Sequence, residues 1–457
     1  MQNNKFRLRI PLIAMMWFLP SIATAQQLDL VLKELIQKGL DKSHSININN
    51  FDIKQAKIDQ KIAKTVFLPN VTLNGSFTRL DDDITFGDAT ENLLVATQKL
   101  LVKEASGITF NSPLPESIPL EPIPNLQDNN ILQSSVDVDW VLFSGFQVKN
   151  AIKASKHQEA SLNYLTKVEE DKVVLKIIEA YDKLALVLAS ESVLNTSRKL
   201  LNEQAYFVKK SIENGLTTPI DRKKIELAQQ QLAGKLLEFE HNKTLLIEVL
   251  HQLTNESRAN LSLLYPELEP FTMGSTSMTE KRNEIKALEE VEQAISYKAE
   301  MEKSNLIPKV ALKGHYEILP NDLSLLDPRW FVAVGIKWKV FDGFQTRLKR
   351  EKYSIESLKY RETKVDAEEM IALSIVNAEL TYKLSLQRIN MVQKEIELSV
   401  ETYDMIYKQY TNSLAPINNV LDALNEVEKS NFKLQESFFN QRRAVIALLH
   451  AKGVLNY

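Results

Sequence analysis

One stretch of this sequence occurs twice, and the repeat limits what the chain can fold into. The first copy reads VLFSGFQ at residues 141–147, and the second reads VFDGFQ at residues 340–345. In each copy an alternating apolar/polar segment precedes the glycine and a long helical pattern follows it. That pattern breaks at Asn214-Gly215-Leu216 and, after the same spacing, at Asn412-Ser413-Leu414. The repeat predicts a duplicated unit of strand, glycine corner, very long helix, tight turn and returning helix.

The first 25 residues have the pattern of a secretory signal peptide. A basic start with Lys5, Arg7 and Arg9 precedes an apolar core at residues 10–20 and the small-residue cleavage signal Ala23-Thr24-Ala25. The apolar run is short for a membrane span, although an N-terminal membrane anchor is the alternative. Cleavage would change the net charge from −3 to about −6, which argues against a nucleic-acid partner. The sequence has no cysteine, which excludes disulfides, zinc-thiolate sites and a lipid anchor after the cleavage site.

Four segments alternate apolar and polar residues with the period of two that strands require, at about residues 71–78, 135–142, 309–318 and 330–340. Trp140, Trp330 and Trp338 lie on the apolar faces near the strand ends, as in the aromatic girdle of an outer-membrane barrel. The polar faces are expected to line a water-filled lumen with Asp137, Asp139, Lys313, His315, Lys337 and Lys339. A soluble antiparallel sheet with one solvated face would alternate in the same way and is the alternative.

Four strands are too few to close a barrel, because known small barrels need about eight. Open sheet edges cannot persist in hydrocarbon, where each unpaired backbone group costs several kcal/mol. If the strands cross a membrane, the strands of several chains must join. Two chains would supply eight strands around a filled interior, and three would supply twelve and leave an opening.

The helical segments are unusually long. Residues 146–213 contain neither proline nor glycine, and a helix of that length would extend about 100 Å. One apolar stripe runs through Val174, Ile177, Ile178, Tyr181, Leu184, Ala185 and Leu188. The second copy has a coiled-coil-like seam at Ile389, Val392, Ile396, Val400, Tyr403, Ile406 and Tyr410. Gly215 suits the left-handed position after a helix, and Pro219 suits the first position of the next one, so antiparallel helical hairpins are expected.

The ordered pair of motifs resembles the TolC-type outer membrane efflux proteins. The resemblance rests on four features: Phe67-Leu68-Pro69 and Leu306-Ile307-Pro308 before strands, the two glycine corners, the Asn214-Gly215-Leu216 turn, and Asn419-Val420-Leu421-Asp422-Ala423 after the second turn. The resemblance covers about residues 27–457. It implies an α+β membrane protein with a duplicated strand-strand-long helix hairpin unit. It also implies a homotrimer in which a twelve-stranded outer-membrane β-barrel is continuous with a twelve-helix periplasmic α-barrel.

The expected boundaries follow from these patterns. The first half has a signal peptide at 1–25, an N-terminal helix at 26–67, and a first β-hairpin at 68–143 with an external loop at 81–133. A first helical hairpin follows at 144–253, with its tip at 214–218, and then an equatorial segment at 254–282. The second half has a helix at 283–306, a second β-hairpin at 307–341, and a second helical hairpin with the C-terminus at 342–457 and its tip at 412–416. The external loop contains five prolines and a short helical pattern at 91–105, and is interpreted as a solvated surface loop or a lid over the mouth.

The resemblance also assigns candidate sites. The tips resemble adaptor-docking turns and comprise Gly215, Leu216 and Thr217 in the first hairpin and Ser413, Leu414 and Ala415 in the second. Helix reversal alone is the structural alternative. Asp404 matches an acidic constriction near the closed periplasmic end, and Tyr407 lies one turn further on. One alternative is that a cluster of Tyr403, Tyr407 and Tyr410 closes the tunnel sterically instead, and another is that Asp404 is an ordinary solvated helix residue. The implied partners are a periplasmic adaptor, an inner-membrane pump of RND, ABC or MFS type, and outer-membrane lipid.

No catalytic pattern is evident. The six histidines are scattered, and no phosphate loop, nucleophile elbow, metal-ligand spacing or cofactor motif occurs, so the chain is not expected to be an enzyme. The favoured function is the outer-membrane channel of a tripartite efflux or type I secretion system. A soluble periplasmic coiled-coil scaffold is the alternative, and the transported substrate is not encoded in any of these motifs.

Overall fold

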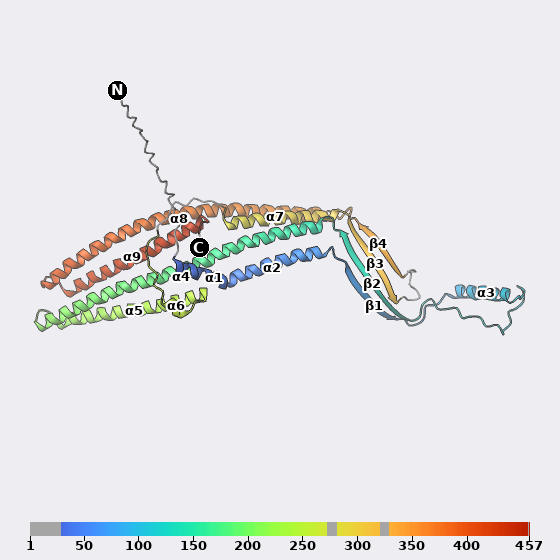
Figure 1. Cartoon of the computed structure of the whole chain (residues 1–457), viewed down its shortest axis with the longest axis horizontal. Coiled ribbons are helices and arrows are strands. Elements are labelled where there is room, and N and C mark those ends of the chain that lie inside the picture. Colours follow the sequence, from blue (N-terminus) through green and yellow to red (C-terminus); the bar gives the residue numbers. More distant parts are fainter. Residues whose placement is uncertain (1–28, 272–280, 320–328, 456) are drawn as a thin grey trace, which may run out of the picture. The chain divides into compact units, whose positions relative to one another are not determined.

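The computed structural model (Figure 1) describes residues 29–271, 281–319, 329–455 and 457 of the 457-residue chain. The predicted signal peptide lies outside these residues, as does most of the link between the third and fourth strands. The chain divides into two compact units, each described by itself below. One unit comprises Met1–Asn49, Tyr164–Ile285 and Asp366–Tyr457, and the other comprises Asn50–Asn163 and Lys286–Val365.

Two helices occupy the N-terminal region for which a single helix was expected. Helix α1 spans Leu30–Lys42 and α2 spans His44–Thr65, with a break at Ser43. Asp29 begins α1 as its N-cap, and its side chain accepts a hydrogen bond from the backbone N–H of Val31. The helical prediction for this region is confirmed, but the break at Ser43 was not anticipated.

The second unit contains a four-stranded antiparallel sheet with the strand order β1-β2-β3-β4. The strands span Asn70–Arg79, Asn130–Phe143, Lys309–Leu319 and Trp330–Lys337. The register pairs Thr72 with Asp137, Asp137 with His315, and His315 with Phe331. Because side chains alternate across a strand, these residues share one face of the sheet, as the sequence predicted.

The fourth strand is shorter than its sequence pattern suggested. It ends at Lys337, so Trp338, Lys339 and Val340 follow the strand instead of belonging to it. The assignment of Lys339 as a lumen-facing strand residue is therefore wrong. The alternation of apolar and polar residues continues past the last ladder hydrogen bond, which is why the pattern alone overestimated the strand.

The two glycine corners have the same backbone geometry. Gly145 and Phe146 have φ angles of 64° and 66°, and Gly343 and Phe344 have φ angles of 64° and 65°. The ring of Phe146 packs edge-on against the phenylalanine three residues before it, at a centroid distance of 5.2 Å, and Phe344 does the same at 5.4 Å. The corners support the predicted duplication down to individual dihedral angles. They differ in surroundings, because a Cβ on Gly145 would lie 2.9 Å from a backbone oxygen, whereas nothing lies within 4 Å of one on Gly343.

Each corner leads into a helix of 67 residues, α4 at Gln147–Glu213 and α8 at Gln345–Thr411. Each long helix turns into an antiparallel partner, α5 at Pro219–Thr254 and α9 at Ile417–Ala451. Pro219 occupies the start of α5, where a missing N–H costs no helical hydrogen bond. The two predicted helical hairpins are confirmed.

The core of the first unit follows the apolar stripes predicted from the sequence. The stripe along α4 is fully buried, with Val174 and Ile177 at 0% exposure, and it packs with residues of α1, α5 and α9. On α8, Ile389, Val392, Tyr403 and Tyr410 are buried, while Val400 remains 39% exposed. Burial of these stripes is what holds helices too long to be stable alone.

The described residues include four shorter elements. They are α3 at Asp88–Ala105 within the long loop, α6 at Arg258–Ser262 within the equatorial segment, α7 at Asn283–Lys303, and a 3-10 turn at Ser304–Leu306. In the described parts of the chain, no helix is both long and apolar enough to cross a membrane.

Candidate functional site

The polar face of the sheet carries an ordered row of charged and polar side chains. A ring nitrogen of His315 lies 2.9 Å from the Asp137 carboxylate, and the side-chain amide of Asn74 donates to the same carboxylate at 2.7 Å. The His315 ring also stacks on Phe331 at a centroid distance of 5.3 Å. Three strands therefore meet in one polar cluster, which combines two of the residues predicted from the sequence.

The remaining predicted residues of this face occupy neighbouring levels of the ladder. Asp139 is the register partner of Lys313, and Lys337 is the register partner of Lys309. The first pair joins opposite charges, whereas the second places two ammonium groups on directly opposed positions. The alternation of the sequence places Lys309, at the start of β3, on the same face as Lys313 and His315, and the register agrees with it.

The opposite face of the sheet is apolar and exposed. Leu73, Phe77, Val334 and Ile336 are between 65% and 71% exposed. In the described residues, β1 pairs only with β2 and β4 pairs only with β3, so both edges of the sheet present unpaired backbone groups. A soluble sheet would bury one of its faces, and this one leaves its apolar face uncovered within the chain.

The two hairpin tips are built identically although their sequences differ. In the first, Gly215 has φ 69°, and the backbone N–H of Leu216 donates to the Ser211 carbonyl at 2.8 Å. In the second, Ser413 has φ 60°, and the backbone N–H of Leu414 donates across the same six-residue interval at 2.8 Å. Both are Schellman-type helix endings.

The tips also present the same kind of surface. Leu216 is 71% exposed and Leu414 is 79% exposed, whereas Thr217 and Ala415 are half-buried. The Thr217 hydroxyl donates to the Asp221 carboxylate at the start of α5. A single large apolar side chain therefore projects from each turn, and hydrogen bonds fix the backbone conformation of the turn that carries it.

The candidate constriction residues separate into exposed and buried positions on α8. Asp404 is exposed and Tyr407 is half-buried, with the Tyr407 ring stacked parallel to Tyr403 at 6.0 Å. Tyr403 and Tyr410 are each only 8% exposed and belong to the packed core. Burial of Tyr403 and Tyr410 disfavours the alternative in which the three tyrosines together close a tunnel, and Asp404 and Tyr407 stay predictions.

A buried glutamine supports this row of tyrosines. The Gln204 side-chain amide on α4 donates to the Tyr403 hydroxyl at 3.2 Å, and Phe207 packs edge-on against Tyr410 at 5.6 Å. Burial raises the pKa of Tyr403 and raises that of Tyr410 to about 12. The sequence analysis did not identify Gln204 as a buried residue. Its spacing of three residues from Leu201, which is also buried, places both on one face of α4 and could have indicated this.

Comparison with known proteins adds information at the level of the fold. No family model and no curated protein matches the sequence. Among solved structures, the outer membrane protein VceC of Vibrio cholerae is 16% identical with a TM-score of 0.69, over 93% of this chain and 96% of that one. The Campylobacter jejuni CmeC outer membrane channel is 12% identical with a TM-score of 0.67, over 93% and 86%. The open state of the Neisseria gonorrhoeae MtrE outer membrane channel is 12% identical with a TM-score of 0.63, over 93% and 89%.

The chain has the fold of these outer membrane channels. The resemblance that the sequence motifs indicated is thereby confirmed for the fold, along nearly the whole length of the described chain. In the channel fold seen here, residues 29–271, 281–319 and 329–455 contain no cluster of three or more side chains able to hold a metal ion.

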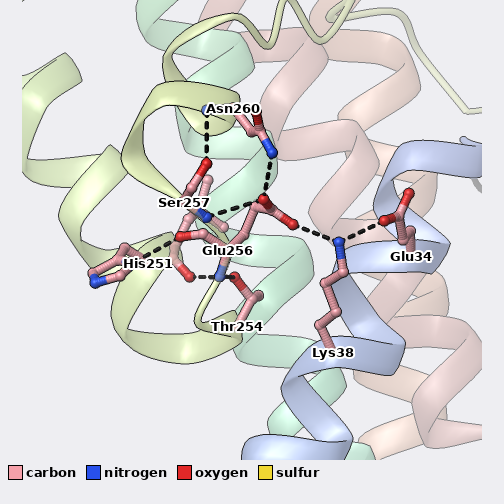
Figure 2. Close-up of polar contacts among 8 residues, drawn as sticks. Glu34, Lys38, His251, Thr254, Glu256, Ser257 and Asn260 are labelled. Carbon is pink, nitrogen blue, oxygen red and sulfur yellow. Dashed lines mark hydrogen bonds and ion pairs between the residues drawn. The ribbon is translucent and has the colours of Figure 1, made fainter.

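A polar network ties the equatorial segment of the channel fold to α1 (Figure 2). The Lys38 ammonium lies 2.5 Å from carboxylate oxygens of both Glu34 and Glu256. The Glu256 carboxylate also accepts hydrogen bonds from the Asn260 amide at 2.7 Å and the Ser257 backbone N–H at 3.0 Å. These donors, Lys38 first, lower the pKa of Glu256 to about 2. None of these contacts was predicted.

A second anchor lies at the other end of the described equatorial segment. The Arg442 guanidinium donates to the buried Asp182 carboxylate at 2.6 Å and 3.0 Å, and to the Glu269 backbone carbonyl at 3.2 Å. Its guanidinium carbon also lies 3.8 Å from the centre of the Phe271 ring. The neighbouring Gln441 side chain forms two hydrogen bonds with the Phe271 backbone, at 2.7 Å and 2.8 Å. One helix face thus fixes the segment through both charge and backbone hydrogen bonds.

Proposed function

We propose that this protein is the outer-membrane channel of a tripartite efflux or type I secretion system. Three copies form a passive conduit, with a β-barrel in the outer membrane and a large helical portion in the periplasm. A periplasmic adaptor docks on it and links it to an inner-membrane pump of RND, ABC or MFS type, which supplies the energy. The proposal includes no catalysis and no cofactor.

The four-stranded sheet carries this proposal. It has two unpaired edges, an exposed apolar face and an opposite face with Asp137, His315 and Lys313 in register. Outer-membrane barrels alternate in this way, with apolar residues toward lipid and polar residues toward water. Because unpaired backbone groups are costly in hydrocarbon, the edges β1 and β4 require partners from other copies. Three copies would supply twelve strands, enough for a barrel with an open interior.

The structural neighbours support the same function. VceC is an outer membrane protein, and CmeC and MtrE are outer membrane channels.

The hairpin tips are proposed to dock the adaptor. Their support is the repeated geometry, in which Leu216 and Leu414 project from equivalent left-handed turns. A helical partner with an apolar stripe could receive both side chains in one groove. Asp404 and Tyr407, exposed and half-buried on α8, are proposed to narrow the periplasmic entrance and to favour cations there.

Fractionation and electrical recording test the function. The full-length protein should require detergent for extraction from outer membranes, migrate as a trimer, and give discrete conductance steps in a planar bilayer. Release of a monomer by osmotic shock, with no detergent requirement, would favour the periplasmic scaffold instead. Trimers that insert into the bilayer but never conduct would contradict the channel while leaving the barrel intact.

A further inference from the structure

A pocket of about 640 Å³ lies where the polar face of the sheet meets the helices of the second unit. Its lining includes Val141, Ala311 and Gly335 from three strands, together with Val148 and Ala151 from α4. The volume falls within the range of pockets that hold small organic ligands, which is roughly 300–1,000 Å³. Nearly all of the lining is apolar, which is unusual beside a row of charged residues.

The hollow lies at a level of the ladder where β3 and β4 carry only a methyl group and a hydrogen, beside Val141 of β2. Ala311 and Gly335 are register partners, whereas the levels further along the same face carry Lys313 opposite Ala333 and His315 opposite Phe331. Gly335 is not required by the backbone, since its φ is not positive and an added Cβ would make only an ordinary 3.9 Å contact. The effect of glycine at this position is therefore to leave the pocket open where a larger side chain would fill it.

Two lysines border this hollow on the next level. Lys309 and Lys337 are register partners, and both line the pocket. Like charges on directly opposed positions destabilise a sheet. In the described residues neither lysine has an ion-pair partner, although the Lys309 ammonium donates to the Gln147 side-chain oxygen at 2.6 Å. The carboxylate of Asp139 belongs to the next level beyond Ala311, opposite Lys313, and neither of those two residues lines the pocket.

We infer that this pocket binds a small amphipathic organic anion, with its apolar body over Ala311 and Gly335 and its anionic group between Lys309 and Lys337. An anion relieves the repulsion between the two ammonium groups and pairs each with a charge-assisted hydrogen bond. A cation would meet two like charges, and an ion without an apolar part would leave the apolar lining unfilled. The pocket is formed by one chain, so binding of the anion does not depend on the proposed function. Only the interpretation of this anion as a class of transported cargo rests on that proposal.

The test measures binding to the full-length protein reconstituted in discs of zwitterionic lipid, with octanesulfonate as the anionic probe. Octyltrimethylammonium, which has the same chain and the opposite charge, is the paired probe. Octanesulfonate should bind the unaltered protein in calorimetry, and octyltrimethylammonium should bind at least about tenfold more weakly, because charge-assisted hydrogen bonds contribute that much.

Two kinds of variant separate the charge from the cavity. Replacing both lysines (Lys309→Gln with Lys337→Gln) should weaken octanesulfonate binding by about tenfold or more. Gly335→Leu keeps both lysines and should also weaken binding, because its side chain fills the hollow. Lys352→Gln removes an exposed lysine of α8 in the same unit and should leave affinity unchanged.

The outcomes are decisive in both directions. Equal binding of the two probes, or unaltered octanesulfonate binding by the double lysine variant, would overturn the inference. Binding that is lost from the double variant but retained by Gly335→Leu would place the anion outside the hollow and would also overturn it. Because binding is measured without ion flow, a protein that conducts but does not bind contradicts only this inference. A protein that binds but does not conduct contradicts only the proposed function.

Discussion

The indole nitrogen of Trp140 donates a hydrogen bond to the backbone carbonyl of Phe67 at a distance of 2.8 Å. The second half of the chain repeats this contact, with the indole of Trp338 donating to the carbonyl of Leu306 at 3.1 Å. Each acceptor lies two residues before a proline, and that proline immediately precedes a strand, β1 or β3. The tryptophans thus stabilise the helix-to-strand junctions through hydrogen bonds, a role separate from the lipid contact expected of an aromatic girdle.

Trp140→Phe should lower stability modestly, because it keeps most of the apolar ring and removes only the donor. We expect a loss of about 0.5–1.5 kcal/mol, the usual contribution of a hydrogen bond. Thermal unfolding of the detergent-solubilised protein, followed by circular dichroism, measures the change. Trp330→Phe is the matched control, since Trp330 makes no indole hydrogen bond to the described residues. Equal effects of the two substitutions would mean that ring size, and not the junction contact, matters.

Ser413→Gly should stabilise the second hairpin tip. The left-handed backbone at Ser413 is strained for any residue with a Cβ, and glycine removes this strain at some cost in unfolded-state entropy. The expected net gain is about 0.5–1 kcal/mol. The reciprocal change Gly215→Ser should cost a similar amount, because its added side chain has open space and only the backbone conformation resists it. Melting temperatures that shift in the same direction for both variants would contradict this explanation.

Asp182 and Arg442 should be strongly coupled. Arg442→Met leaves a buried, unpaired carboxylate, and we expect it to cost about 3–5 kcal/mol. Adding Asp182→Leu should recover much of that loss, because the uncompensated charge disappears. Urea denaturation of the two single variants and the double variant measures the coupling. Strictly additive losses would show that the ion pair is not what anchors Arg442.

The Glu256 network should make stability depend on acid pH. The pKa of Glu256 is lowered to about 2 by Lys38, Asn260 and the Ser257 backbone N–H. A carboxyl with a depressed pKa stabilises the fold fully above its ordinary pKa of about 4.5, and this stabilisation is lost as pH falls from there toward 2. The melting temperature of the native protein should therefore exceed that of Glu256→Gln at pH 6, and the difference should shrink as pH falls below 4.5 and disappear only near pH 2. Glu240→Gln, at an exposed position of α5, should show no such convergence.

Asp404→Asn should reduce the cation preference that we propose for the channel. Asp404 is exposed on α8, so its charge can act on passing ions, whereas the buried Tyr403 cannot. Reversal potentials in a salt gradient across a planar bilayer measure selectivity, and Tyr407→Ala should raise conductance without a comparable change in selectivity. If Asp404→Asn combined with Tyr407→Ala alters neither quantity, these residues do not form the constriction.

Local chemistry made the repeated unit predictable. Glycine corners, helix stops and period-two alternation act within a few residues, so the strands, the long helices and the tips could be located from the sequence. The end of β4 at Lys337 and the break at Ser43 could not, because the same local patterns continue across both positions. Pairings such as Lys38 with Glu256 and Arg442 with Asp182 depend on the packing register of helices that are distant in sequence. The sequence placed Tyr403 both in the apolar seam and among the constriction candidates, and packing against α4 is what decides for the seam.

The two glycine corners have unequal freedom to change over evolutionary time. At Gly145 any side chain would meet the carbonyl oxygen of Ser304, so nearly every mutation there should be lost by selection. At Gly343 only the backbone dihedral angle resists replacement, so asparagine or aspartate could become established. Descendants of a single ancestral repeat should therefore retain the first corner and vary at the second, and a survey of natural variants would reveal this asymmetry.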